Sequence, residues 1–196
     1  MKWAKVILIL LLGLSMCGCV PQLSIYPLWD KEHVASEPAL VGTWISEDGT
    51  EFIQFKEEDQ QRYLVVYSAT DGKESSQSSY TVHMVRLEGA LFLDFEPEQN
   101  ALEGRLKPEL YLPLVSAHFF ARADVQGDEL RLAVLDDEAF LNKIKNDKID
   151  IRYERPNPSN DDHILSAKTE EIQKFFSMYA TDRDLWKENT FHRVIN

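Results

Sequence analysis

The sequence predicts a mainly β fold, an antiparallel meander that forms a barrel or half-barrel, with two helices in its second half. Between Ala39 and Leu135, short runs rich in Val, Ile, Phe, Tyr and Thr alternate with turn residues at intervals of about 8 to 15 positions. This spacing is typical of sandwiches and barrels and differs from the longer strand–helix alternation of βαβ folds. Two segments with helical apolar spacing lie near 137–146 and 169–181.

Short polar segments with glycine separate the predicted strands. Asp48-Gly49, Glu88-Gly89 and Gly127-Asp128 are the clearest turn signals. The polar segment 70–79 is expected to be a loop. The expected strands cover residues 40–45, 51–56, 63–67, 80–87, 90–95, 110–123, 130–135 and 149–153.

Both predicted helices have start signals. Asp136 and Asp137 are expected to cap the first helix, and Thr169 the second. The second helix carries an apolar stripe that we expect to be buried on the outside of the sheet. The tail 185–194 is expected to pack as well. The stripe consists of Ile172, Phe175, Phe176, Tyr179 and Ala180.

The first 18 residues have the order of a secretory signal peptide. Lys2 and Lys5 precede the apolar run Val6–Leu12, and small residues follow. The run is shorter than the roughly 20 apolar residues that a helix needs to cross a bilayer. We therefore expect cleavage after residue 18, with 19–38 as a tether and 39–196 as a single β-rich domain.

The segment Leu14-Ser15-Met16-Cys17-Gly18-Cys19 resembles the lipobox of bacterial lipoproteins, in which a cysteine receives a diacylglyceryl group before cleavage. Cys19 is the expected site, because Gly18 fits the small residue that the family prefers before the cysteine. Cys17 is the second candidate, because it places Leu14 where the family usually has Leu. The alternative is an ordinary secreted protein with stray cysteines in its signal.

The lipobox resemblance implies a membrane partner. Bacterial lipoproteins carry acyl chains on the mature cysteine, and two or more chains hold a protein stably on a bilayer. Val20 follows Cys19 where an Asp would favour the inner membrane. The resemblance therefore implies a cell-envelope location, at the outer membrane facing the periplasm if the organism has two membranes.

Composition excludes some partners. The formal net charge is −12, and it is near −14 once Lys2 and Lys5 leave with the signal. Nucleic acids and anionic headgroups attract basic patches, so we expect neither as a partner of the domain. Cys17 and Cys19 are the only cysteines of the sequence, so no disulfide is expected within the domain.

The triplet Gly42-Thr43-Trp44 opens the first strand after a possible helical turn and resembles the G-x-W motif of lipocalins. That resemblance implies a barrel whose tryptophan closes one end and packs against a basic residue from a late strand; the candidates are Arg122, Arg152 and Arg155. The alternative is an ordinary core tryptophan. Together with Tyr26-Pro27-Leu28, the triplet is also similar to the opening of uncharacterised bacterial lipoproteins.

Catalytic and metal-binding patterns are weak. The five histidines form no HxH or HExxH pattern, so we expect no metal site and no cofactor. No G-x-S-x-G elbow is present. Ser116 and His118 share a strand face and would be the first candidates for a hydrolase. His83 and His118 both lie on predicted strands and could meet across a sheet, but we expect each to be a core or edge histidine with its own hydrogen-bond partners. We expect no enzyme.

Two functions remain open for a membrane-anchored barrel. An eight-stranded barrel can hold one small apolar ligand. Alternatively, large side chains fill the interior, and the protein is a non-catalytic interaction or structural lipoprotein of the envelope. For the binding function, the expected ligand-lining residues are Tyr63, Val65, Tyr67, His83, Phe92, His118 and Phe120.

Overall fold

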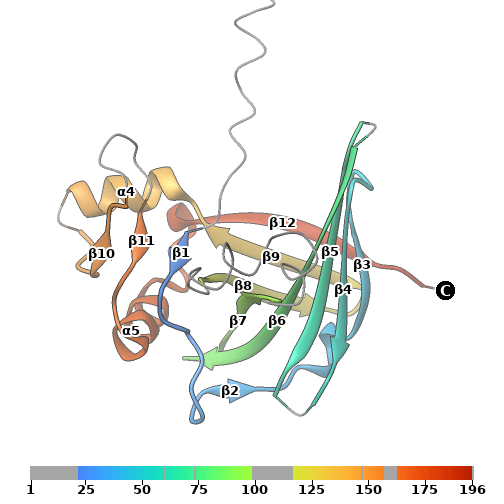
Figure 1. The fold of residues 1–196 in the computed structure, drawn as a ribbon, viewed down its shortest axis with the longest axis horizontal. Helices are drawn as coiled ribbons and strands as arrows, with labels where there is room; N and C mark the ends of the chain where they lie inside the picture. The colour runs from blue at the N-terminus through green and yellow to red at the C-terminus, as the bar shows by residue number, and fades with distance from the viewer. Residues whose placement is uncertain are drawn as a thin grey trace, which may run out of the picture.

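The computed structural model describes residues 22–59, 61–72, 74–98, 117–146, 148–156 and 163–195, and their strands form a closed barrel (Figure 1). Seven strands follow one another as an antiparallel meander, and an eighth lies between the last and the first. The predicted β barrel is therefore confirmed, and it is closed. The strands are β3 (Gly42–Ser46), β4 (Glu51–Glu57), β5 (Tyr63–Asp71), β6 (Glu74–Leu87), β7 (Ala90–Pro97), β8 (His118–Gln126), β9 (Glu129–Leu135) and β12 (Trp186–Arg193).

The eighth strand, β12, comes from the C-terminal tail. It pairs with β9 from Trp186 opposite Leu135 to His192 opposite Glu129. Its other edge pairs with β3, where Arg193 lies opposite Trp44. The sequence predicted only that this tail packs on the domain. By pairing on both edges, β12 removes the two open edges that β3 and β9 would otherwise present.

The two ends of the barrel differ, and we call them the mouth and the base. The mouth carries the turns 46–51 and 71–74 and the start of β8. The base carries the 3₁₀ helix η1 (Pro38–Leu40) and the turns 57–63, 87–90 and 126–129.

A helical insertion joins β9 to β12. It contains α4 (Asp137–Lys145), β10 (Tyr153–Glu154), β11 (Ile164–Leu165), α5 (Thr169–Tyr179) and the 3₁₀ helix η2 (Arg183–Leu185). Both predicted helices are therefore confirmed in position. Asp136 caps α4 as predicted, accepting a hydrogen bond from the Ala139 amide at 2.8 Å.

The predicted cap of α5 was wrong by one residue. Lys168 is the N-cap of this helix, and its amide donates to the Glu171 carboxylate at 3.0 Å. The Thr169 hydroxyl instead donates to the carbonyl of Pro27 at 2.9 Å. Thr169 therefore connects α5 to the N-terminal segment, and the Glu171 side chain caps the start of the helix.

The N-terminal segment contributes two short strands to the barrel wall. β1 (Leu23–Ser24) pairs antiparallel with the start of β8 and parallel with β11, which pairs with β10. β9 pairs with β8 only from Ala121 onward, so β1 continues the wall beside β8 at the mouth. β2 (Val34–Ala35) pairs with β6 at Val85 and Met84.

Three predicted segments differ from the structure. The polar segment 70–79 is mostly strand: residues 70–71 end β5 and residues 74–79 begin β6, because hydrogen bonding between the two strands extends the hairpin past its apolar part. Residues 149–152 are not a strand, although Ile149 and Ile151 are 5% and 8% exposed, and the strand begins only at Tyr153. Of the expected strand 110–123, residues 110–116 lie outside the described part of the chain.

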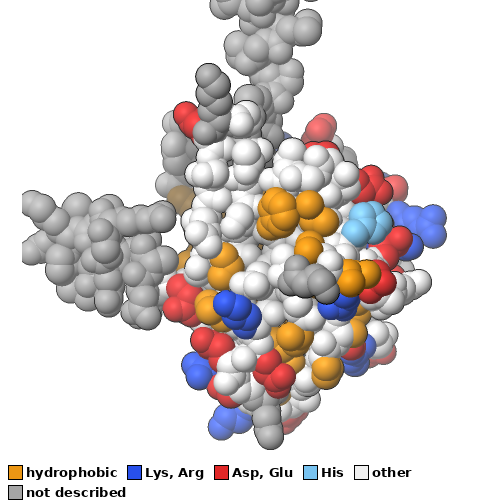
Figure 2. All heavy atoms as spheres, turned by 90° about the vertical axis from the view of Figure 1, so that its right-hand side faces the viewer, with side chains coloured by type: hydrophobic (Ala, Val, Ile, Leu, Met, Phe, Trp, Pro, Cys, Tyr) orange, Lys and Arg blue, Asp and Glu red, His pale blue; other side chains and the backbone are white. Residues whose placement is uncertain are grey.

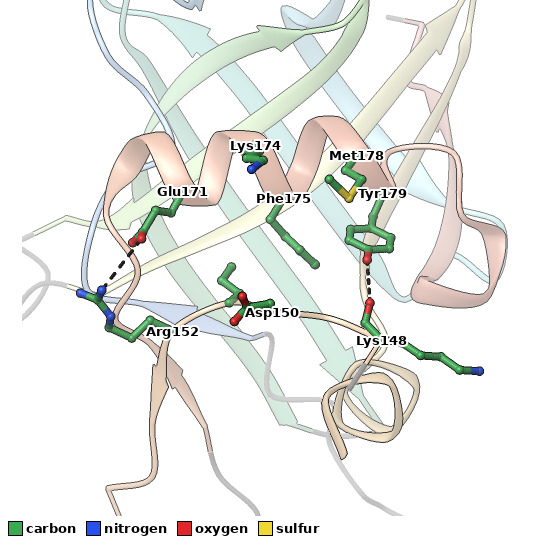
Figure 3. A pocket seen from close by; sticks show the side chains of 9 residues that line it. Lys148, Asp150, Arg152, Glu171, Lys174, Phe175, Met178 and Tyr179 are labelled. Carbon is green, nitrogen blue, oxygen red and sulfur yellow. Dashed lines mark hydrogen bonds and ion pairs between the residues drawn. The ribbon is translucent and has the colours of Figure 1, made fainter. Parts of the chain in front are cut away.

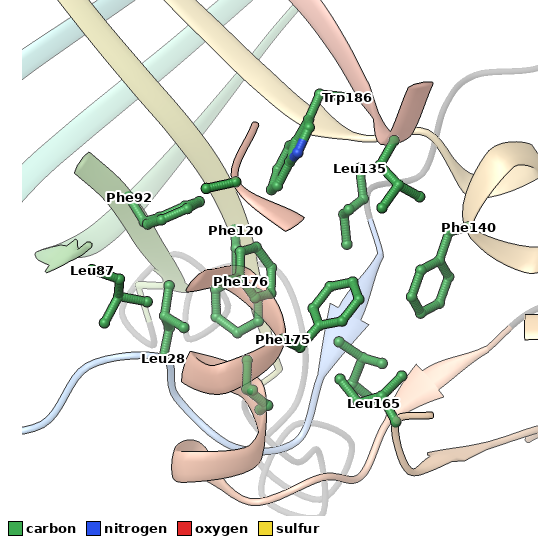
Figure 4. Close-up of a cluster of buried hydrophobic side chains, with 14 of the residues drawn as sticks. Leu28, Leu87, Phe92, Phe120, Leu135, Phe140, Leu165, Phe175, Phe176 and Trp186 are labelled. Carbon is green, nitrogen blue, oxygen red and sulfur yellow. The ribbon is translucent and has the colours of Figure 1, made fainter. Parts of the chain in front are cut away.

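Two apolar cores share the barrel wall. The inner core lies inside the barrel, and the outer core lies between the wall and the helices α4 and α5 (Figure 4). The apolar stripe of α5 is buried in the outer core, as predicted. There Phe176 makes edge contacts with Phe92 and Phe120 from the wall, with ring centroids 5.3 and 5.2 Å apart. Strands β6 to β9 are therefore apolar on both faces.

Candidate functional site

The base of the barrel is closed around Trp44. Its indole N–H donates to the carbonyl of Leu40 at 2.8 Å, and its ring is fully buried. The guanidinium of Arg193 lies 4.2 Å from the ring centroid and donates to the carbonyls of Val41 (2.9 Å) and Ala39 (2.5 Å). The basic residue that covers the tryptophan is therefore Arg193 of β12.

The three arginines predicted for this role lie elsewhere. Arg122 is on the outer face, where its guanidinium lies 5.4 Å from the Trp186 ring centroid. Arg152 forms an ion pair with Glu171 at 3.9 Å. Arg155 follows β10, away from the base. The prediction was wrong because the tail was not recognised as the last barrel strand.

The mouth of the barrel holds a cavity of about 520 Å³. Its walls come from β4 to β9 and β12, so it lies inside the barrel on the side away from Trp44. This volume is within the range of sites for one small molecule, about 300–1,000 Å³. The cavity is lined by Glu51, Ile53, Tyr67, Tyr80, Phe95, Phe119, Ala121, Leu132, Val134, Lys187, Asn189 and Phe191.

The lining combines charged side chains with a cluster of aromatic rings. Glu51 and Lys187 lie at the mouth ends of β4 and β12. Phe95 and Phe119, near the mouth ends of β7 and β8, stack with ring centroids 4.6 Å apart, and Tyr80 meets both rings edge-on. Such a lining suits a molecule with an apolar body and a polar end.

Tyr67 and Glu51 form a polar pair in this wall. Burial and a hydrogen bond from the Tyr67 hydroxyl to the Glu51 carboxylate raise the pKa of Tyr67 to about 12. The phenol therefore stays protonated throughout the physiological range and remains a donor. The pair provides a fixed donor and a charged acceptor within an otherwise aromatic wall.

The seven residues predicted to line a ligand site fall on both faces of the wall. Tyr63, Val65 and Tyr67 point into the barrel, but only Tyr67 lines the cavity; the other two are fully buried. Phe92 and Phe120 belong to the outer core. His83 and His118 also lie on the outer face, beside Asp94. The structure therefore does not bring the seven together.

Sequence reasoning missed most of the cavity lining. Phe95 shares the inward face of β7 with Leu91 and Leu93, whereas the prediction chose Phe92 from the other face. Lys187 and Asn189 lie on β12, which was not recognised as a strand. The pairing register offered a usable signal. A residue that lies opposite an inward residue on the neighbouring strand also points inward, so the inward face of each strand can be traced around the sheet from Trp44.

The two strand histidines flank a buried carboxylate on the outer face. Asp94 accepts from His118 Nδ1 at 2.7 Å and from the Leu28 amide at 2.6 Å. Burial lowers the pKa of His118, but the hydrogen bond to Asp94 and the negative charges of Asp94 and Glu96 together outweigh burial, and the pKa is raised. His83, opposite Asp94 in the register, stacks on Trp29 at 4.1 Å, and burial lowers its pKa.

This cluster attaches the N-terminal segment to the barrel. Trp29 stacks on His83, and the amides of Leu28 and Trp29 both donate to Asp94. Gln173 of α5 completes the attachment by donating to the carbonyl of Leu28 at 2.9 Å. In the described structure, Asp94 and His118 thus help to pack the N-terminal segment against the barrel. Ser116, the predicted partner of His118, lies outside the described residues.

A second hollow, of about 710 Å³, lies on the surface between α5 and residues 148–152 (Figure 3). Charged side chains of both signs border it, including Lys148, Lys174 and Asp150. The Tyr179 hydroxyl donates to the carbonyl of Lys148 at 2.8 Å and closes one end. This groove is larger than the mouth cavity, but its lining is more polar and its rim is charged.

In the described ranges, no group of three or more His, Cys, Asp or Glu side chains is placed to hold a metal ion. The described helices include none that is long and apolar enough to cross a membrane. Comparison with protein-family models, with curated proteins and with solved structures found no match to this chain.

Proposed function

We propose that this protein is an envelope lipoprotein, anchored through acyl chains on Cys19, whose lipocalin-like barrel binds a small and mainly apolar molecule. The observation that carries the proposal is the aromatic cavity at the mouth of a closed eight-stranded barrel. Barrels of this size have room for side chains or for one small ligand. Here the base is filled around Trp44, and the mouth is hollow.

The lining favours an amphipathic ligand. Phe95, Phe119 and Tyr80 offer flat apolar surfaces, against which an apolar body gains by leaving water. Glu51 and Lys187 offer an acceptor and a cation at the rim. We therefore propose an apolar molecule with one polar end, seated with that end at the mouth.

The second candidate is a non-catalytic interaction lipoprotein. It is favoured by the groove between α5 and residues 148–152, which lies on the surface and has charges of both signs. The lower half of the barrel fits this candidate as well, since the large side chains of Trp44, Phe55 and Tyr63 are all fully buried there. Under this function the mouth cavity would hold only water.

Native mass spectrometry of the full chain, extracted from membranes in mild detergent, separates the two. The binding function predicts a stoichiometric adduct beyond the mass of the acyl chains on Cys19, recovered as an apolar compound on solvent extraction. The interaction function predicts the acylated mass alone, together with envelope proteins that crosslink to Lys148 or Lys174 in the groove.

A further inference from the structure

The N-terminal end of the described chain is part of the barrel mouth. In the pairing of β1 with β8, Leu23 lies opposite Phe119 and Ser24 opposite His118. Phe119 lines the mouth cavity, and neighbouring strands lie about 4.8 Å apart. The chain therefore joins the barrel beside the cavity, at the end opposite the Trp44 base.

The chain is held firmly from Gln22 onward. The side-chain amide of Gln22 donates to the carbonyl of His163 at 2.7 Å, and the residue is only 8% exposed. Ser24 is fully buried, and the amide of Ile25 donates to the carbonyl of Leu165 at 2.9 Å. These contacts fix the position of Gln22 relative to the wall of the mouth.

Only three residue steps separate Gln22 from Cys19, and an extended chain covers at most about 11 Å in that distance. Resting on the proposed acylation of Cys19, we propose that the β1 edge of the mouth is held against the bilayer surface. The cavity then exchanges its apolar ligand directly with the membrane. An apolar molecule that crossed bulk water would expose its surface, which is unfavourable in proportion to its apolar area.

The surface next to β1 suits contact with a bilayer. Ile25 and Tyr26 directly follow β1, and each is 41% exposed. Tyrosine is typical of membrane–water interfaces. The face on the far side from β1, on the right of Figure 1, instead shows charged side chains of both signs around small, separate apolar patches (Figure 2). Ile25 and Tyr26 are close in sequence to the proposed anchor at Cys19, so they lie at the anchored end of the chain.

The test uses the full acylated chain in phosphatidylcholine vesicles with headgroup-labelled quencher lipid. A fluorophore is attached through Glu138→Cys, at the start of α4 beside the mouth, or through Gln61→Cys, in the base turn 57–63. A matched variant carries a flexible Gly/Ser spacer of 20 residues between Pro21 and Gln22, which reaches about 25 Å on average. Flotation with the vesicles verifies the anchor in each variant.

The proposal predicts strong quenching at position 138, weak quenching at position 61, and loss of most of this difference with the spacer. Equal quenching at the two positions, or no effect of the spacer, would overturn it. A chain that does not float with the vesicles would overturn both the anchor and the inference. This readout needs no ligand, so it decides the inference independently of whether the cavity binds one.

Ligand transfer gives a second readout. The spacer should slow the transfer of an apolar fluorescent probe, N-phenylnaphthylamine, from the vesicles into the cavity several-fold. The affinity for probe added from water should stay the same. The same spacer inserted after Gly127, in the base turn, should change neither quantity. Equal transfer rates with and without the tether spacer would contradict direct exchange, whereas absence of probe binding in every variant would count against the cavity function alone.

Discussion

The guanidinium of Arg193 covers the ring of Trp44 at 4.2 Å and joins the last barrel strand to the first. The same guanidinium donates to the carbonyls of Ala39 and Val41, which flank the end of η1. One side chain thereby fixes the strand that closes the barrel, the tryptophan that fills its base and the 3₁₀ turn that covers it.

Replacing Arg193 with Met should therefore lower the free energy of unfolding by about 2 kcal/mol, from loss of the cation–π contact and of the charge-assisted hydrogen bonds. Arg193→Lys keeps the charge but loses the planar fork, so its effect should be intermediate. Urea unfolding of both variants measures this. A Met variant within 0.5 kcal/mol of the parent, on the order of a surface substitution, would show that the contact does not hold the base closed.

Gly42→Ala should destabilise the same region. Gly42 has a φ of +133°, which L side chains rarely adopt, and an added Cβ would lie 2.8 Å from Arg193 Nη1. We expect a loss of about 2–3 kcal/mol, from backbone strain and from displacement of the guanidinium. Gly89→Ala is the control, because its φ is also positive but no atom lies within 4 Å of the added Cβ. Equal losses would mean that the close approach to Arg193 is unimportant.

The outer core should depend on α5. Phe176→Ala removes a fully buried ring that contacts Phe92, Phe120 and Trp186, and we expect a loss of about 3–5 kcal/mol. Met178→Ala on the same helix is the control, because Met178 is 61% exposed and should change stability by less than about 0.5 kcal/mol. Thermal and urea unfolding compare the two. A small effect of Phe176→Ala would mean that the barrel does not need the helix.

The histidines beside Asp94 should have opposite effects on the pH dependence of stability. The raised pKa of His118 means that its contribution is fully present below its ordinary value of 6.5 and declines as pH rises through the folded pKa. The lowered pKa of His83 means that its contribution is present above 6.5 and is lost as pH falls through the folded pKa.

His118→Gln should therefore destabilise the protein more at pH 5.5 than at pH 8, whereas His83→Gln should destabilise it more at pH 8. Unfolding curves of both variants and the parent at the two pH values measure this. Each variant is the control for the other, because they lie on the same face of the wall and flank the same carboxylate. Parallel pH dependences in the two variants would contradict the described roles.

Local patterns predicted the meander and both helices, because turns, caps and apolar periodicity depend on neighbouring residues. They did not predict β12. Trp186 and Phe191 are an odd number of positions apart, so on a strand they face opposite sides, one into the outer core and the other into the barrel. The two apolar residues lie on opposite faces of the strand, and four polar residues separate them. The sequence of β12 therefore shows no alternation of apolar and polar residues.

The same double burial obscured the cavity. Strands β6 to β8 pack on the inner core with one face and on α5 or the N-terminal segment with the other, so both faces are apolar. Because apolar residues occur on both faces, apolar character alone predicted Phe92 and Phe120 as lining residues, whereas Phe95 and Phe119 line the cavity. Choosing the inward face requires the register of the closed sheet, and that depends on residues far apart in the sequence.

The most direct test of the binding function fills the cavity with a large side chain on one of the strands that line it. Asn189→Trp places an indole in the mouth, and Glu188→Trp places the same side chain on the outer face of the same strand. In a fluorescence titration with N-phenylnaphthylamine, we expect saturable one-to-one binding to the parent and to Glu188→Trp, and binding weaker by about tenfold or more, or 1.4 kcal/mol, to Asn189→Trp. Absence of saturable binding to the parent, or equal affinities of the two variants, would contradict a ligand site in the barrel mouth.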